Sequence, residues 1–274
     1  MVTPEDVAVS ICNEKAYDFH GPAGEGSFKH TFRVESVGVP LALKLFKEPP
    51  TERSAREIEA MLRCDHPNVA KLLAVDAIRL DSNIFYYQIE EYLSGGTLTD
   101  RIGSLDAPMI ASLAQTLAGA LHHIGSHNLV HRDLKPDNIM FRDSSNTSPV
   151  IVDFGLVRDL SATSLTATWQ MRGPGSPFFA APEQLNNEKE LIKPWTDQFG
   201  LGVTLAYSLF QTHPYAEPGE SPGTIVTRVA ERHRPSQAFI AACADAGLRP
   251  LARMVLPFPI ERFLRTGDLL NAWR

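Results

Sequence analysis

Six polar or charged residues stand together in VHRDLKPDNIMF (residues 130–141), between apolar flanks. A loop in free solvent does not need the apolar residues 129–130 before it and 139–141 after it, so the flanks predict that the loop is anchored to a core. Ionisable groups near a core destabilise a fold unless they are paired or functional, because burial disfavours the charged form. The stretch therefore predicts a polar loop that is fixed at both ends and has a chemical task.

A second polar site follows an apolar strand. VIVDFGLV (residues 150–157) has the pattern of a buried strand that ends at Asp153. An acid in that place is a poor packing residue, so we expect this segment to converge with the one that carries Asp133 and Asn138. Carboxylate and amide oxygens suit Mg²⁺, a hard ion that usually keeps waters and phosphate oxygens as its other ligands. Asp133 and Asn138 would then serve different partners, one a proton and the other a metal.

Length and composition exclude several classes of protein. The chain has 274 residues, 43% of them hydrophobic, which suffices for a large core and usually means two lobes or domains. A net charge of −6 and a pI near 5.8 are not those of a nucleic-acid-binding protein. No apolar run approaches the roughly 18 residues that span a bilayer. Cys12, Cys64 and Cys243 are odd in number and widely spaced, which predicts free buried thiols in a soluble, cytoplasmic protein.

The character of the sequence changes along the chain. Residues from about 10 to 95 are predicted to form mostly strands with one helix, including a hairpin around Gly38. The later segments APMIASLAQTLAGALHHIGSHN and TDQFGLGVTLAYSLFQ have the patterns of an amphipathic and a buried helix. We therefore expect an α+β fold with a small β-rich N-terminal lobe at residues 1–93 and a larger, mostly helical lobe at residues 94–274.

Taken together, the motifs resemble those of the protein kinase family. HRDLKPDN resembles the catalytic loop of that family, DFG (153–155) its metal-binding motif and APE (181–183) the end of its activation segment. GEGSF (24–28) is similar to the glycine-rich loop, and LALKLF to the strand with the phosphate-binding lysine. Alone, the glycines would indicate a turn and the lysine a surface residue. The motifs nevertheless occur in the family's order, which implies a bilobal protein kinase fold.

The resemblance implies roles in phosphoryl transfer for the polar residues noted above. In such reactions the protein mainly positions groups and balances charge. Asp133 is expected to be the base or orienter for the acceptor hydroxyl, and Lys135 to neutralise the γ-phosphate. Asn138 and Asp153 are expected to hold the metal ions. The expected cofactors are ATP and Mg²⁺, with Mn²⁺ as an alternative.

The resemblance also implies a nucleotide-binding set in the N-terminal lobe. Lys44 is expected to bind the α- and β-phosphates while Glu57, on the predicted helix, pairs with it. Two glycines would let backbone N–H groups approach the phosphates, because no Cβ blocks them. The remaining members expected to bind the cofactor are Gly24, Gly26, Glu91 and Leu93.

Two positions depart from the pattern of the family. The third glycine of the loop is replaced by Lys29, which we expect to stiffen the loop while ATP binding is retained with an altered nucleotide affinity. In the hinge QIEEYLSGG, Glu90 stands where a hydrophobic or small polar residue is usual. This carboxylate either competes for Lys44, points away from it or takes up a proton.

The segment between DFG and APE suggests regulation. Arg132 and Arg158 occupy positions where the family builds a phosphate-binding pocket, so phosphorylated Thr166 or Thr168 would dock there. The alternative is a loop that merely contains threonines. Ser176 is expected beside the catalytic Asp and Lys. The resemblance further assigns structural roles to Glu183, Asp197 and Arg262, with Arg262 pairing with Glu183.

The expected function is that of a serine/threonine protein kinase. The lysine two positions after Asp133 is the serine/threonine form of the motif, and a peptide shelf at GSPFF favours protein substrates. Two alternatives remain open, a pseudokinase that acts as a scaffold and a small-molecule phosphotransferase of kinase-like fold. The expected partners are ATP and a protein substrate, with no nucleic acid and no membrane segment. A regulatory partner or domain outside the 274 residues is also left open.

Overall fold

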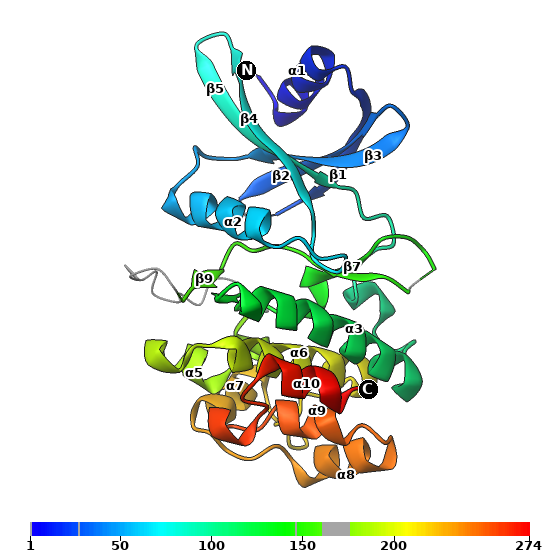
Figure 1. Ribbon diagram of the computed structural model, residues 1–274, viewed down its shortest axis with the longest axis vertical. Helices are drawn as coiled ribbons and strands as arrows, with labels where there is room; N and C mark the ends of the chain where they lie inside the picture. Colours follow the sequence, from blue (N-terminus) through cyan, green and yellow to red (C-terminus); the bar gives the residue numbers. More distant parts are fainter. Residues whose placement is uncertain (1, 27, 146, 161–175) are drawn as a thin grey trace. The chain divides into compact units, whose positions relative to one another are not determined.

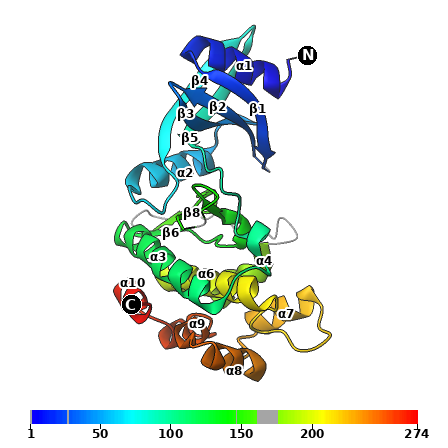
Figure 2. The ribbon, with the colours of Figure 1, turned by 90° about the vertical axis from the view of Figure 1, so that its right-hand side faces the viewer.

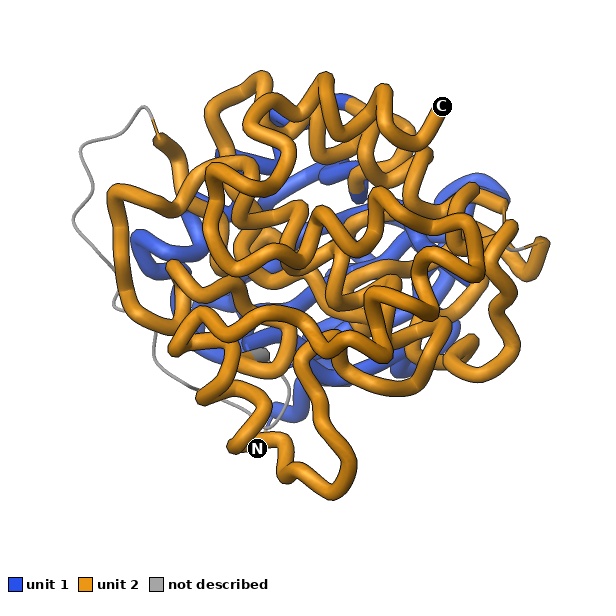
Figure 3. Tube along the Cα trace, turned by 90° about the horizontal axis from the view of Figure 1, so that it is seen from below, with its two compact units in different colours: residues 1–65, 70–94 blue, residues 66–69, 95–274 orange. Residues whose placement is uncertain are grey.

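The computed structural model describes residues 2–26, 28–145, 147–160 and 176–274. The chain divides into two compact units, which are coloured separately in Figure 3. Unit 1 comprises Met1–Asp65 and Ala70–Ser94, and unit 2 comprises His66–Val69 and Gly95–Arg274. Unit 1 is an antiparallel sheet with two helices, and unit 2 is mostly helical. The α+β fold, β-rich in its N-terminal part and helical in the remainder, is confirmed.

The sheet of unit 1 has five strands in the order β1-β2-β3-β5-β4, all antiparallel to their neighbours. Its strands are β1 (Asp18–Glu25), β2 (Lys29–Ser36), β3 (Val39–Phe46), β4 (Leu72–Leu80) and β5 (Asn83–Glu91). The hairpin expected around Gly38 joins β2 to β3. Val37 and Gly38 form its turn with φ angles of 50° and 76°, the left-handed conformation that two-residue hairpin loops favour.

Unit 1 contains a helix that we did not expect from the sequence. Helix α1 (Pro4–Lys15) precedes the sheet, so residues 10–95 hold parts of two helices where one was predicted. A capping box starts α1, since Oγ1 of Thr3 accepts the N–H of Asp6 at 3.2 Å and the Asp6 carboxylate accepts the N–H of Thr3 at 2.8 Å. The buried residues of α1 recur at helical spacing and pack on the sheet; they are Val7, Ala8, Ile11 and Cys12.

The two faces of this sheet carry different chemistry, because successive side chains of a strand point to opposite sides. One face is apolar and is covered by α1; its residues include Leu41, Leu43, Leu45, Tyr87 and Ile89. The other face carries the polar side chains of Lys44, Gln88 and Glu90, on the side of helix α2 (Glu52–Arg63). Figures 1 and 2 show α1 and α2 on opposite sides of the sheet. The strands thus build a core on one side and a polar site on the other.

Unit 2 is organised around one buried helix. Helix α6 (Pro194–Phe210) is buried along almost its whole length, as its apolar sequence predicts. It contacts α3 (Ala107–Ser126) and α9 (Arg249–Met254), while α10 (Thr266–Ala272) packs on α3 (Figure 2). The remaining helices are α4 (Ser176–Phe179), α5 (Pro182–Leu185), α7 (Pro222–Ala230) and α8 (Gln237–Asp245). Within the described ranges, no helix has the length and apolar character that crossing a membrane requires.

His213 joins the segment after α6 to helix α4. Its buried ring has Nε2 2.9 Å from the carbonyl oxygen of Phe178, and its Nδ1 accepts the N–H of Tyr215 at 3.1 Å. A carbonyl oxygen only accepts, so Nε2 carries the proton and the ring is neutral. Burial lowers the pKa of His213 from 6.5 to about 4, and protonation of Nδ1 would break the bond to Tyr215.

This histidine should make the stability of the protein fall in mild acid. Between pH 6.5 and 4 the unfolded chain binds a proton that the folded chain rejects, so folded stability is lost as the pH falls. From pH 7.5 to 5.0 the loss assigned to His213 amounts to about 2 kcal/mol. Urea denaturation of wild type and His213→Gln at both pH values measures it. Equal pH dependence of the two proteins would contradict the assignment.

Candidate active site

Short strands of unit 2 hold the polar loop at residues 131–138. Strand β6 (Leu129–Val130) pairs with β9 (Arg158–Asp159), and β7 (Ile139–Phe141) pairs with β8 (Pro149–Ile151). The carbonyl of Asn138 accepts the N–H of Val152 at 3.0 Å. Because Val152 directly precedes Asp153, this pairing brings together the two segments that the sequence predicted to converge.

Two side chains of the loop meet at the carboxylate of a third. Oδ2 of Asp133 lies 3.0 Å from Nζ of Lys135 and 3.0 Å from Nδ2 of Asn138. Nδ2 of Asn138 also donates to the carbonyl oxygen of Asp133 at 2.8 Å. With its amide hydrogens directed at Asp133, Asn138 keeps its amide oxygen as an acceptor for another group. The carboxylate is thus fixed in position and neutralised by Lys135.

The backbone of the loop is held by a buried acid. Asp197, on α6, accepts the N–H groups of His131 and Arg132, both at 2.8 Å. Burial raises the pKa of Asp197, while these two N–H groups favour its charged form. Arg132 has a φ of 69°, a left-handed conformation that is unfavourable for a side chain of this size. The acid on α6 therefore stabilises a turn that the sequence alone would not prefer.

His131 connects the loop to the segment around Asp153. Its buried Nε2 donates to the carbonyl oxygen of Val152 at 3.1 Å, and its Nδ1 lies 3.3 Å from the N–H of Asp133. The ring also packs edge-on against Phe154, with 4.9 Å between the centroids. One histidine thus orients the backbone on both sides of the site.

Asp153 is suited to a metal ion by its exposure and its conformation. Its side chain is exposed, its φ is 63°, and its Oδ1 accepts the N–H of Gly155 at 3.0 Å. The buried Phe154 anchors the turn that presents it. A carboxylate from Asp153 and the amide oxygen of Asn138 are hard oxygen ligands of the type that Mg²⁺ takes. These two residues fit the metal that the sequence predicted.

The expected regulatory residues are only partly described. Nε of Arg132 donates to the carbonyl oxygen of Leu156 at 2.6 Å, and Nη1 of Arg158 donates to that of Lys189 at 2.5 Å. Thr166 and Thr168 lie outside the described residues. Ser176 begins α4, but its side chain also lies outside them.

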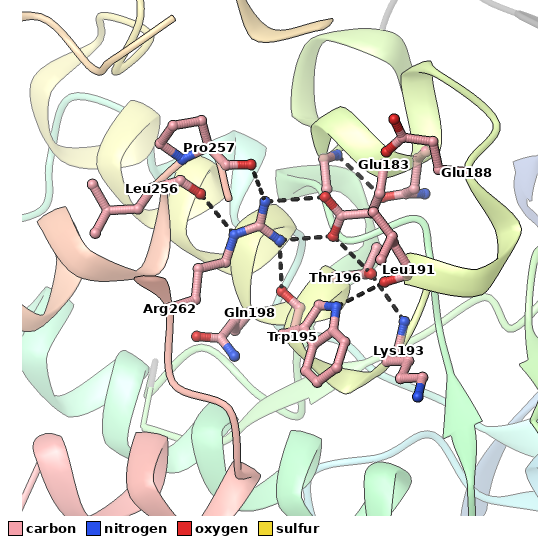
Figure 4. Close-up of polar contacts among 12 residues, drawn as sticks. Glu183, Glu188, Leu191, Lys193, Trp195, Thr196, Gln198, Leu256, Pro257 and Arg262 are labelled. Atoms are coloured by element: carbon pink, nitrogen blue, oxygen red, sulfur yellow. Dashed lines mark hydrogen bonds and ion pairs between the residues drawn. The ribbon is translucent and has the colours of Figure 1, made fainter. Parts of the chain in front are cut away.

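A fully buried ion pair lies beside the loop. Arg262 and Glu183 form two contacts, with Nη1 2.7 Å from Oε1 and Nη2 3.0 Å from Oε2, and both side chains are 0% exposed (Figure 4). Arg262 also donates to the carbonyl oxygens of Leu256, Pro257 and Trp195. Glu183 in turn accepts the hydroxyl of Thr196 at 2.9 Å. The pair ties the end of APE to α6 and to the segment before α10.

In unit 1 the glycines of the loop are not required by packing. A Cβ added to Gly24 would meet no described atom within 4 Å, and one added to Gly26 would meet only the carbonyl oxygen of Lys29, at 3.7 Å. Both residues lie at the turn between β1 and β2, where Gly24 pairs with Thr31. The open space beside them fits the approach of a ligand. Of the expected hinge residues, Glu91 ends β5 and Leu93 is buried.

Lys44 and Glu57, which we expected to pair with each other, each have a further charged partner. Nζ of Lys44 lies 2.6 Å from Oε2 of Glu90, and Nζ of Lys29 lies 2.6 Å from Oε1 of Glu57. Of the three alternatives for Glu90, competition for Lys44 is therefore the one observed. The physical reason is burial: a carboxylate with only 4% of its side chain exposed needs a cation within reach.

The role of Lys29 is what sequence reasoning missed. The sequence did contain a signal for a second cation. Two carboxylates, Glu57 and Glu90, were expected beside Lys44, which was the one lysine expected there. Strand alternation adds a second signal, because Lys29 and Thr31 share a face and Thr31 pairs with Lys44. Lys29 therefore belongs to the polar face.

Comparisons with known proteins show the family of the chain. The model of the protein kinase domain matches residues 17–238. MARK-C, a probable serine/threonine-protein kinase of Dictyostelium discoideum, is 33% identical over 214 residues, which are 77% of this chain and 26% of that protein. The DNA damage-responsive serine/threonine-protein kinase RqkA of Deinococcus radiodurans is 32% identical over 200 residues, 69% of this chain and 29% of that protein.

A third relative has a similar identity. Calcium-dependent protein kinase 5 of Plasmodium berghei is 32% identical over 186 residues, which are 64% of this chain and 32% of that protein. The chain thus spans about a quarter to a third of the length of these three relatives. The family match covers most of the chain and includes the loop with Asp133 and the segment with Asp153. The chain belongs to the protein kinase family.

Proposed function

We propose that the chain is a serine/threonine protein kinase that transfers the γ-phosphoryl group of Mg-ATP to hydroxyl groups of proteins, including its own. A bond forms between the acceptor oxygen and the γ-phosphorus, the bond to the bridging oxygen of the β-phosphate breaks, and ADP leaves. The proton of the acceptor hydroxyl goes to the carboxylate of Asp133. Bound Mg²⁺, held by Asn138 and Asp153, supplies positive charge to the phosphate oxygens.

The observation that carries this proposal is the fixed carboxylate of Asp133. Its Oδ2 is held by Lys135 and Asn138, whereas Oδ1 accepts no hydrogen bond from the described residues. Oδ1 is thus the oxygen left for a substrate hydroxyl. Lys135, whose ammonium is within 3.0 Å of the carboxylate, brings positive charge to the same place for the phosphoryl group.

The type of acceptor is supported by the relatives, which are named as serine/threonine and calcium-dependent kinases. The scaffold alternative is disfavoured because each polar residue that phosphoryl transfer needs in unit 2 is present. A small-molecule substrate is disfavoured because the family match is to the protein kinase domain.

Incubation of the protein with Mg²⁺ and radiolabelled ATP tests the proposal. We expect label in the protein and in a serine/threonine peptide library, with phosphosites at Ser or Thr in mass spectra. Binding of ATP without turnover would support the scaffold instead, and label only in a small molecule would support the other alternative. Asp153→Ala serves as the control for a contaminating kinase.

A further inference from the structure

Unit 2 contains a cavity that has no part in the proposed phosphoryl transfer. The cavity has a volume of about 220 Å³ and lies between the helical turn Thr99–Arg101, the first half of α3 and the hairpin of β7 and β8. Among its described lining residues is none of those assigned to catalysis or to metal binding. Benzene fills an apolar cavity of about 150 Å³, so the space is sufficient for a small organic molecule.

The cavity has a largely apolar floor and a rim with hydroxyl groups. The buried residues of its floor are Leu113, Phe141, Pro149 and Arg101. The rim carries exposed serine and threonine residues, among them Ser112 on α3. The hydroxyls of Ser104 and Thr116, which also line the cavity, donate to backbone carbonyl oxygens at 2.7 and 3.0 Å. The guanidinium of Arg101 is therefore the strongest donor that the described lining offers to a ligand.

Arg101 is a buried cation without a counter-ion among the described residues. The residue is 9% exposed, and its Cζ lies 3.6 Å from the centre of the Phe141 ring. Its Nη2 donates to the carbonyl oxygen of Gly95, whereas its buried Nε has no hydrogen-bond partner. Burial lowers the pKa of Arg101, and the charge of the neighbouring Asp100 offsets this effect only in part. The Oδ2 atom of Asp100 accepts the N–H and the hydroxyl of Thr97, at 2.7 and 2.9 Å.

The missing partner of Arg101 has a definable chemistry. An arginine keeps its proton in proteins, so it does not avoid the cost of burial by becoming neutral. A buried charge is destabilising unless it is paired and hydrogen-bonded. Of the five N–H groups of this guanidinium, the described residues accept one. A carboxylate fits the remainder, because its two oxygens accept two parallel N–H groups of a guanidinium.

We propose that this cavity binds a small carboxylic acid with an apolar body, whose carboxylate pairs with Arg101. The apolar body packs on Leu113 and Pro149, and the exposed rim gives access from solvent. An inorganic anion would supply the charge but would leave the apolar floor without a partner. The site goes beyond the proposed kinase function, because its ligand is neither the nucleotide nor the phosphoryl acceptor.

The test compares phenylacetate with phenylacetamide, a neutral probe of nearly the same shape. Titrations followed in ¹H–¹⁵N NMR spectra at pH 7 give both affinities for wild type, Arg101→Met and Ser112→Phe. The phenylalanine at position 112 would fill the cavity without changing Arg101. Gln115→Phe adds the same ring on α3 outside the lining, and Arg253→Met removes another arginine that stacks on a phenylalanine, at 4.3 Å from the ring of Phe263.

We expect wild type to bind phenylacetate at least about 10-fold more tightly than phenylacetamide, the effect of a charge-assisted hydrogen bond. Arg101→Met should lose this preference and still bind the amide, whereas Ser112→Phe should bind neither probe. Gln115→Phe and Arg253→Met should behave as wild type. Equal affinities of wild type for the two probes, or no saturable binding at millimolar concentration, would overturn the inference. Binding of phenylacetate that survives in Ser112→Phe would overturn it even if Arg101→Met failed to fold.

Discussion

Asp133→Asn should lower kcat for phosphoryl transfer by about 10²- to 10⁴-fold, the usual contribution of a positioned general base. Asparagine has the same shape, and its amide oxygen still accepts from Lys135 and Asn138, which both contact Oδ2 in wild type. Its NH₂ group would then take the place of Oδ1. An amide neither accepts the proton of the hydroxyl nor carries the negative charge that orients Lys135.

The matched control for this prediction lies in the same loop. Asp137 is exposed and accepts the hydroxyl of Thr99 at 2.8 Å, away from Asp133. Asp137→Asn makes the same chemical change and should leave kcat unaltered. Initial rates at saturating Mg-ATP, with calorimetry to show that ATP still binds, measure both variants. An Asp133→Asn protein that keeps more than a tenth of the wild-type kcat would show that this carboxylate is not the base.

Arg262→Met should reduce the free energy of unfolding by about 3–5 kcal/mol, the range found when one partner of a buried ion pair is removed. The change would leave Glu183 without a cation in a site where its side chain is 0% exposed. Three carbonyl oxygens, of Leu256, Pro257 and Trp195, would lose their donors at the same time. Urea denaturation at neutral pH measures the loss.

An exposed pair of similar geometry provides the comparison. Arg234 contacts Glu261 through two nitrogens at 2.6 and 3.0 Å, but its side chain is 60% exposed. Arg234→Met should therefore cost at most about 1 kcal/mol. Glu183→Met/Arg262→Met should be more stable than Arg262→Met alone, because it contains no buried carboxylate without a partner. If Arg262→Met and Arg234→Met lost the same free energy of unfolding, burial would not explain the stability of the Arg262 pair.

The sequence allowed the site of unit 2 to be predicted because its geometry is largely local. Asp133, Lys135 and Asn138 lie within six residues, and a short helical turn at Pro136–Asn138 is enough to bring their side chains together. Asp153 approaches this loop if the apolar strand before Asp153 simply pairs with the strand that follows the loop. The tight turn at Arg132 was not predictable, because it depends on two bonds to Asp197, 65 residues away.

The pairing of the lysines in unit 1 could not be derived in the same way. Lys29, Lys44 and Glu90 come from three different strands, and which ammonium reaches which carboxylate depends on strand register and burial. The resemblance to the protein kinase family implied a partner for Lys44 but none for Lys29. Helix α1 was missed for another reason: its apolar stripe is short, and the capping pair of Thr3 and Asp6 was not recognised as a helix start.

Because of helix α1, the match to the family and the folded unit 1 begin at different positions in the chain. The match to the family begins at residue 17, two residues after α1 ends at Lys15. A fragment that begins at residue 17 would keep every matched residue. Without α1, however, it would expose the apolar face of the sheet to water, including Val34 and Leu43. Large apolar patches of this kind promote self-association. The part of unit 1 that the family match covers is therefore shorter than the part that must be expressed for unit 1 to fold without self-association.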